Sequence, residues 1–326
     1  MVRRAVLWAA AALGGCGSFQ DPSIVLDLRV LAMRAEPADQ VIDVDLTQPV
    51  DAQTLLAQVV PTQVCALVAD PGPERQLAWS MTLCPLGTDD RCDPDGPAAE
   101  IGSGLLEDPE LAFPEPALCA TVMPDINLIA VVSFVLQDDT LRGLGGVDYG
   151  VVLRVVGDAG NRDLDQYAAK TLSIAPRIPA DRAANHNPSL DGISASVDGG
   201  TPTMLTLGRC LDNPSPYRLP AGTKVRLTPV ETAGARERYT VPTLDGRAES
   251  FTESLTYQWV ASAGGFSDGT TGGPHDISGN PAPLFTDYRA PAADDLAIAG
   301  PITLWIVQRD ERRGVHWYES CVRIGR

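Results

Sequence analysis

The chain ends in two apolar stretches, ITLWIVQRD (302–310) and VHWYESCVRI (315–324), with Glu311 to Gly314 between them. Two β-rich runs around a short turn that contains glycine predict a β-hairpin. Strict alternation of apolar and polar residues fails in the second stretch, because Trp317 and Cys321 fall on the opposite face from Val322. We expect a β-bulge near Glu319 to repair this pattern.

The same two-residue period recurs along most of the chain. Leu255, Tyr257 and Trp259 alternate with polar neighbours, and 30 glycines and 27 prolines punctuate the apolar runs. A period of two with one apolar face is typical of a sheet covered on one side, and two such sheets face to face make a sandwich. Further alternating sets lie at 77–83, 151–155 and 224–228.

The length and a proline-rich segment divide the chain into two parts. A chain of 326 residues suggests about two domains. Residues 176–188 (PRIPADRAANHNP) carry three prolines and little apolar content, which predicts a linker. We therefore expect domains at 25–175 and 189–326, each long enough to bury its own core.

One segment does not show the two-residue period. Residues 125–139 (DINLIAVVSFVLQDD) form a continuous apolar run after Asp125, which could cap a helix. A buried strand or a short helix would fit such a run. The β-branched content favours the strand.

Three stretches in the second part resemble a known family. These are SLTYQWVASAGGFSDGTTG (254–272), LFTDYRAPAA (284–293) and LWIVQRDERRGVHW (304–317). They are similar to immunoglobulin-like repeats of bacterial envelope proteins, and CALVADPGPERQLAWSMTLCP (65–85) resembles the second and third strands of such a repeat. The resemblance implies two tandem immunoglobulin-like β-sandwich domains, as in uncharacterised bacterial surface lipoproteins.

The first 16 residues resemble the signal of a bacterial lipoprotein. Arg3 and Arg4 precede the apolar run AVLWAAAAL (5–13), and Leu13-Gly14-Gly15-Cys16 follows the order of a lipobox. The resemblance implies removal of residues 1–15, acylation of Cys16 and a lipidated tether at 16–24. An ordinary secretory peptide with a chance cysteine is the alternative. Gly17, where aspartate would signal inner-membrane retention, favours the outer membrane of the cell envelope.

Cysteine parity supports an oxidising compartment. Of seven cysteines, six remain once Cys16 is lipidated, and an even set outside the cytosol predicts three disulfides. Local spacing favours some of the 15 connectivities over others, although pairing in the first part stays open. A zinc site is disfavoured, because the chain has no C-x-x-C motif and its three histidines are far apart. The favoured pairs are Cys210–Cys321, Cys84–Cys92 and Cys65–Cys119.

The charged residues argue against a nucleic-acid partner and suggest a calcium site. The formal net charge is −17, and Lys170 and Lys224 are the two lysines, so we expect no nucleic-acid partner. The segment 87–97 (GTDDRCDPDGP) gathers oxygen donors of the kind that bind Ca²⁺, although a solvated acidic turn is the alternative. Apart from calcium we expect no cofactor. The calcium candidates are Asp89, Asp90, Asp93 and Asp95.

We expect no catalytic residues. The segment 265–269 (GFSDG) matches a nucleophile-elbow motif, but the glycine-rich residues after it cannot readily begin the helix that the motif needs. Three acidic pairs could suggest glycosidase carboxylates, but they lie in polar stretches typical of solvated turns. They are Asp138–Asp139, Asp163–Asp165 and Asp294–Asp295.

These features predict a non-catalytic envelope protein, anchored to the membrane by lipid, that serves as a binding or scaffolding module. Its partner would be an envelope protein or a glycan, and outward-facing aromatic side chains among Trp305, Trp317 and Tyr318 could contact it. The alternatives are a hydrolase or metal-dependent enzyme that acts on envelope polymers, and a purely structural spacer.

Overall fold

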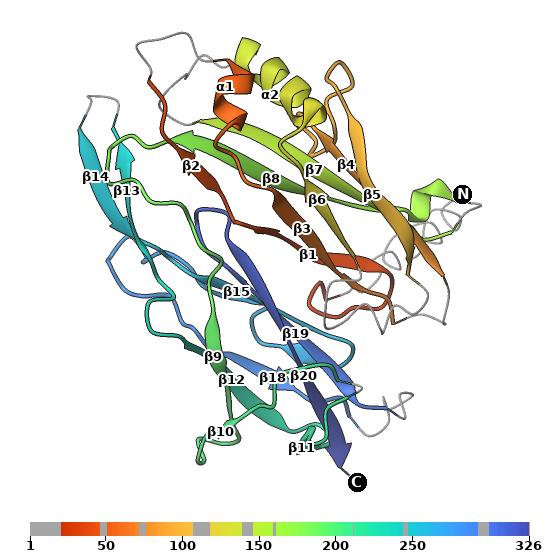
Figure 1. Cartoon of the computed structure of the whole chain (residues 1–326). Coiled ribbons are helices and arrows are strands. Elements are labelled where there is room, and N and C mark those ends of the chain that lie inside the picture. The colour runs from red at the N-terminus through yellow and green to blue at the C-terminus, as the bar shows by residue number, and fades with distance from the viewer. Residues whose placement is uncertain are drawn as a thin grey trace, which may run out of the picture.

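The computed structural model describes residues 21–45, 51–71, 76–106, 118–138, 146–158, 161–210, 212–243, 247–292 and 300–325. Its regular structure is almost entirely β, which confirms the all-β class predicted from the two-residue period. Figure 1 shows two lobes, with the strands up to Pro176 in one and those from Leu190 onward in the other. We call these lobes the first and the second half.

Two sheets form the first half. Its strands are β1 (Arg29–Glu36), β2 (Gln40–Ile42), β3 (Thr62–Ala69), β4 (Leu77–Cys84), β5 (Ala99–Leu106), β6 (Cys119–Val122), β7 (Val147–Val156) and β8 (Gln166–Pro176). One sheet has the order β2-β8-β7-β4-β5 and the other the order β1-β3-β6. The alternating residues Leu77, Met81 and Leu153 lie in a core that both sheets line.

The segment 125–139 is helical, so the strand favoured from its composition is wrong. Helix α2 (Ile126–Asp138) begins after Asp125, whose carboxylate accepts hydrogen bonds from the backbone N–H groups of Asn127 and Leu128. The helix packs against β4, β7 and the short helix α1 (Ala52–Leu56), at the end of the first half that faces away from the second (Figure 1). Its buried residues follow helical spacing, which places them on one face: Leu128, Val131, Val132 and Leu136.

The second half is a sandwich of two five-stranded sheets. Its strands are β9 (Leu190–Ser196), β10 (Thr203–Met204), β11 (Tyr217–Pro220), β12 (Lys224–Glu231), β13 (Arg238–Pro242), β14 (Ala248–Thr252), β15 (Thr256–Ala261), β16 (Gly265–Phe266), β17 (Thr270–Gly272), β18 (Thr286–Arg289), β19 (Ile302–Arg309) and β20 (Val315–Gly325). The sheets have the orders β10-β9-β12-β18-β16 and β11-β20-β19-β15-β17. Leu255, Tyr257 and Trp259 lie between them, fully buried.

The terminal hairpin pairs without interruption. Strands β19 and β20 are in register from Ile302 opposite Val322 to Arg309 opposite Val315, so the bulge expected near Glu319 is wrong. No bulge is needed, because both faces of the hairpin are covered. Tyr318 and Val322 pack with the core of the second half, whereas Trp305 and Trp317 pack on the first half.

An apolar joint holds the two halves together. Leu31, Ala32 and Leu67 of the first half meet Val307 and Val315 of the second in one buried cluster. The chain before β1 also takes part, since the N–H of Val25 donates to the carbonyl of Ala261 at 2.9 Å. Ser23 and Ile24, expected in the tether, also pack on the second half, where the carbonyl of Ser23 accepts from the N–H of Ala261.

The linker segment is packed as well. Asn187 donates to the carbonyl of Ala35 at 2.8 Å and accepts from the N–H of Val315 at 2.8 Å, so one side chain joins both halves. In the part of the chain that the structure describes, no helix has the length and apolarity needed to cross a bilayer.

Candidate functional site

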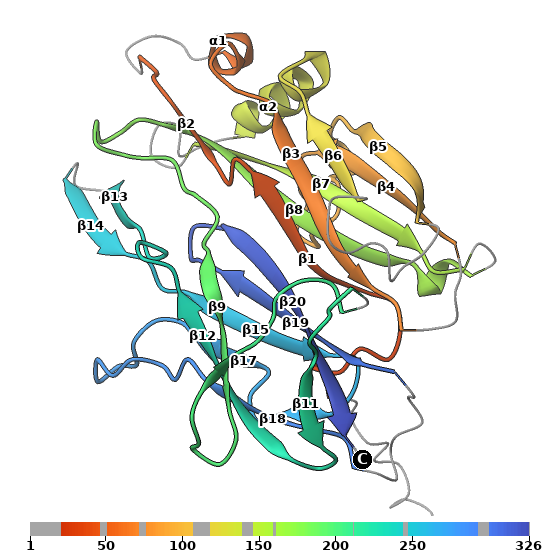
Figure 2. The same cartoon turned by 60° about the horizontal axis from the view of Figure 1, so that its bottom comes forward.

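A two-stranded arm stands off the side of the second half. Strands β13 and β14 pair with each other, away from both five-stranded sheets (Figures 1 and 2). All five residues of β14 are exposed to solvent. The rings of Tyr239 and Phe251 stack across the two strands, with their centres 5.7 Å apart. Because an isolated hairpin is only marginally stable in water, such an arm needs support at its base.

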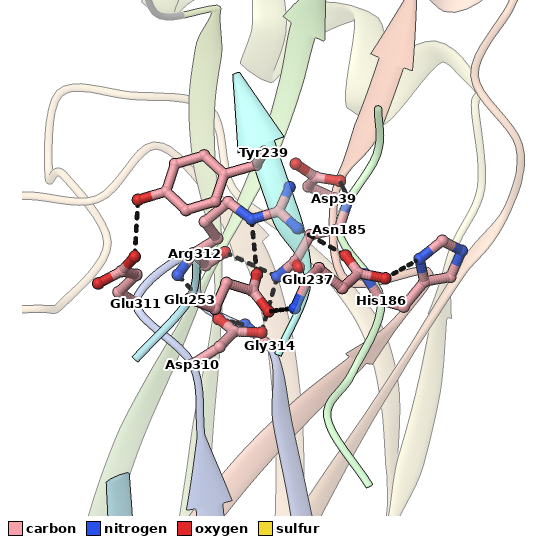
Figure 3. A network of polar contacts seen from close by, with 10 residues as sticks. All are labelled: Asp39, Asn185, His186, Glu237, Tyr239, Glu253, Asp310, Glu311, Arg312 and Gly314. Carbon is pink, nitrogen blue, oxygen red and sulfur yellow. Dashed lines mark hydrogen bonds and ion pairs between the residues drawn. The ribbon is translucent and has the colours of Figure 1, made fainter. Parts of the chain in front are cut away.

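Arg312 provides this support from the turn of the terminal hairpin. Its Nε donates to Glu253 Oε1 at 2.7 Å, and its Nη2 donates to Glu237 Oε2 at 2.6 Å (Figure 3). Glu237 directly precedes β13 and Glu253 directly follows β14, so the two glutamates face each other at the base of the arm. The guanidinium also lies over the ring of Tyr239, 4.8 Å from its centre. The side chain of Arg312 thus binds the chain at the start of β13 and at the end of β14.

Glu253 is the most deeply buried acid of this network. It is 2% exposed, and its second carboxylate oxygen accepts from the backbone N–H of Glu237 at 3.0 Å. Burial raises the pKa of the Glu253 carboxyl, while the Glu237 amide and Arg312 act in the opposite direction. A buried carboxylate of this kind depends on its partners, since without them its charge would be uncompensated.

Asp310 connects the turn to the linker. Its Oδ1 accepts from the N–H groups of Arg312 and Gly314 at 2.8 and 2.7 Å, and its Oδ2 accepts from Asn185 at 3.0 Å. An added Cβ at position 314 would collide with the Asp310 carboxylate, so a larger residue there would displace this carboxylate from its hydrogen bonds. The backbone N–H of Asn185 in turn donates to Asp39 Oδ1 at 2.5 Å, which brings the first half into the network. Burial raises the pKa of Asp39.

Two contacts complete the network at its surface. His186 Nδ1 lies 2.7 Å from Glu237 Oε1, and the Tyr239 hydroxyl donates to Glu311 Oε1 at 2.7 Å. Burial, and then Glu311, raises the pKa of Tyr239 to about 12. The acidic groups of the network accept hydrogen bonds from Arg312, backbone amides and neighbouring side chains. This arrangement stabilises the arm and the joint.

The structure contains the three disulfides favoured from the sequence. Cys65 and Cys119 face each other on β3 and β6, and Cys210 ties the loop before β11 to Cys321 on β20. Cys84–Cys92 closes the acidic loop. Cys16, the predicted lipidation residue, lies outside the described residues.

The acidic loop is an ordinary turn, so the expected calcium arrangement at Asp89, Asp90, Asp93 and Asp95 is not formed. Asp89 and Asp93 accept from the backbone N–H groups of Arg91 and Asp95, at 3.2 and 2.9 Å. The carboxylates of Asp89 and Asp93 therefore stabilise the turns in which they lie. Within the described ranges, no three His, Cys, Asp or Glu side chains are grouped closely enough to hold a metal ion.

The other sequence candidates are dispersed. Ser267 lies between strands β16 and β17, with no helix after it, and its hydroxyl donates to Asp268. Asp165 forms an ion pair with Arg154 at 2.6 Å. Asp139, Asp294 and Asp295 lie outside the described residues, as does the side chain of Asp163. The terminal aromatic residues do not form an outward-facing contact surface, because Trp305, Trp317 and Tyr318 pack inward.

Sequence reasoning missed the polar network. Its members come from five separated segments of the chain, and none of these segments shows a local motif that predicts a buried charge. The nearest signal is Arg309-Asp310 before Gly314, which contributed to the family resemblance. That pattern predicts the turn, but it does not predict the ion pairs of Arg312 with Glu237 and Glu253.

The chain matches no protein-family model, and no curated protein matches it. Among solved structures it is similar to the native conformation of E. coli alpha-2-macroglobulin, at 11% sequence identity and a TM-score of 0.20. The match covers 91% of this chain, and this chain spans 17% of the length of that protein. A likeness at this level carries no argument about function.

Proposed function

We propose that the protein is a non-catalytic, lipid-anchored binding module of the cell envelope, which contacts a protein partner through the β13–β14 arm. The observation that carries this proposal is the arm itself, which presents an exposed strand edge and is fixed at its base by the partly buried Arg312. In the described residues, β14 pairs with no strand other than β13. An unpaired edge of this kind can accept a strand from another protein.

Hydrogen-bond geometry identifies the free groups of this edge. The N–H of Glu253 donates to Glu237, and the N–H of Thr243 donates to Arg247. In an antiparallel pair, hydrogen-bonded positions alternate with non-hydrogen-bonded ones. Phe251 and Glu249 are therefore bonded to β13, whereas the backbone N–H and C=O groups of Ser250 point toward the free edge.

The envelope location has separate support. Three disulfides suit an oxidising compartment, and the lipobox at Leu13-Gly14-Gly15-Cys16 would hold the protein at a membrane surface. Anchorage is tested by Cys16→Ala followed by cell fractionation. Release of the protein from the membrane is expected, and unchanged processing and retention would contradict the lipid anchor.

The arm is tested by Ser250→Pro, which removes the outward N–H while leaving the bonds from Glu249 and Phe251 to β13 intact. Ser250→Ala is the matched control, because it loses the same hydroxyl but keeps the N–H. With a photo-crosslinking residue at Ala248, in intact cells, we expect a discrete adduct in wild type and in Ser250→Ala, and its loss in Ser250→Pro. If no adduct forms in wild type, or if Ser250→Pro retains it, the arm is not the contact surface.

A further inference from the structure

A pocket of about 330 Å³ lies at the joint between the two halves. Strands β1 and β8, which contact each other, form two of its walls with residues 30–33 and 168–171. The terminal hairpin closes the third side with Arg309, Arg313 and Val315. Its volume lies within the range of small-molecule sites, ~300–1,000 Å³.

Lys170 lines this pocket and is 5% exposed. Its Nζ donates to the carbonyl of Arg313 at 2.5 Å. An ammonium group has three N–H donors, and among the described residues this carbonyl is its one hydrogen-bond acceptor. Asp310 is the acid that acts on it electrostatically, but the carboxylate of Asp310 is already engaged by Arg312, Gly314 and Asn185.

Arg309 is a second, partly buried cation in the same wall. Its guanidinium donates to the side-chain oxygen of Gln258 at 2.9 Å and to the carbonyl of Leu31 at 3.1 Å, both neutral acceptors. Burial lowers the pKa of Arg309, and no acidic group in the described part of the chain acts against this effect. The third cation, Arg313, pairs with Asp148 in an exposed bridge of 2.7 Å.

The pocket therefore gathers three cations in a protein whose net charge is −17. Among the described residues, neither Lys170, which is buried, nor Arg309, which is partly buried, forms an ion pair with a carboxylate. A buried charge without a counter-charge is costly, and a bound anion removes that cost. Apart from Thr171, the other lining residues are apolar and include Val30, Met33, Ala168 and Val315.

We propose that this pocket binds a small organic anion, with its oxyanion head on Lys170 and Arg309 and its apolar part against β1 and β8. Carboxylate and phosphate heads both fit the planar guanidinium and the ammonium, so the shared chemistry is an oxyanion on a short apolar tail. The pocket goes beyond the proposed function and does not rest on it, because it involves neither the arm edge nor Cys16.

Isothermal titration calorimetry of the purified protein at pH 7 tests the proposal with hexanoate, hexyl phosphate and hexylammonium. We expect a Kd below about 1 mM for at least one anion, and the tighter of the two identifies the head group. Hexylammonium, with the same tail and the opposite charge, should not bind. If neither anion reaches about 1 mM, or if hexylammonium binds as tightly, the proposal is wrong.

Two lysine variants localise the binding. Lys170→Met keeps the length and apolar stem of the side chain without its charge, and we expect at least a tenfold loss of anion affinity. Lys224→Met is the matched control, because Lys224 is exposed and paired with Asp287. It should bind like wild type. Equal effects of the two substitutions would overturn the assignment to the pocket.

A measurement on wild type decides the question if Lys170→Met does not fold. Burial lowers the pKa of Lys170 to about 8, with Arg313 and Arg309 acting in the same direction and Asp310 against it. A bound anion would favour the ammonium, so binding at pH 8 should take up a fraction of a proton. Calorimetry in two buffers of different ionisation enthalpy measures this uptake. Anion binding without proton uptake would place the anion elsewhere.

Discussion

At the scale of single residues, Arg312 is the cation on which the arm depends. Its guanidinium is 15% exposed and it pairs with Glu253, which is 1% exposed at the side chain. Removing one partner of a buried pair leaves the other charge uncompensated, which costs about 3–5 kcal/mol. We expect Arg312→Met to lower the free energy of unfolding by about 3 kcal/mol, as measured by urea denaturation. Arg238→Met, on the exposed face of β13, should change it by less than about 0.5 kcal/mol. Equal values would show that the network does not stabilise the fold.

His316 gives the protein a predicted sensitivity to acid. Burial, and then Arg34, lowers the pKa of His316, whose ring stacks on Tyr318 with centres 4.7 Å apart. The unfolded chain therefore binds a proton at this residue more readily than the folded one. The stabilising contribution is complete above pH 6.5 and is lost as the pH falls below it. In wild type the free energy of unfolding should fall between pH 7 and pH 5, and we expect His316→Gln to make this fall smaller. His275→Gln, on an exposed loop, should leave the pH dependence of the unfolding free energy unchanged.

At the scale of elements, α2 depends on its first turn. The carboxylate of Asp125 accepts from two backbone N–H groups that would otherwise lack partners. Loss of such a cap costs about 1 kcal/mol. We expect Asp125→Ala to lower the unfolding free energy by this amount in urea denaturation, and Asp27→Ala, at an exposed position outside any element, to have no measurable effect. A neutral Asp125→Ala would mean that packing on β4 and β7 alone determines where the helix begins.

At the scale of the whole molecule, the apolar joint makes the two halves one cooperative unit. Val307 is fully buried at the joint, on the hairpin face that would be open to solvent if the second half stood alone. An aspartate there should separate the halves while leaving each core intact. We expect one calorimetric transition in wild type and two in Val307→Asp. Val230→Asp, at a position 36% exposed, is the matched control and should keep a single transition. A single transition in Val307→Asp would indicate that the halves are coupled mainly through polar contacts.

Local properties of the sequence were sufficient to predict β-strands and the terminal hairpin. The two-residue period of Leu255, Tyr257 and Trp259 depends on residues that are neighbours in the chain, and the same holds for the terminal hairpin. Cysteine parity and spacing likewise favoured the pairs that the structure contains. The helix at 126–138 could not be read from periodicity, because its apolar run is continuous. Helical spacing is visible only among the residues that the fold buries, such as Leu128, Val132 and Leu136.

Long-range packing determined everything at the joint. Trp305 and Trp317 disturb the alternation of the terminal hairpin because the first half covers the outer face of that hairpin. No pattern within the hairpin predicts that the first half will pack there. The partners of Arg312 are likewise 59 and 75 residues away in the chain. The pocket around Lys170 arises only where β8 meets a hairpin more than 130 residues later. Such contacts depend on how the halves dock, and a one-dimensional pattern of apolar and polar residues does not contain that information.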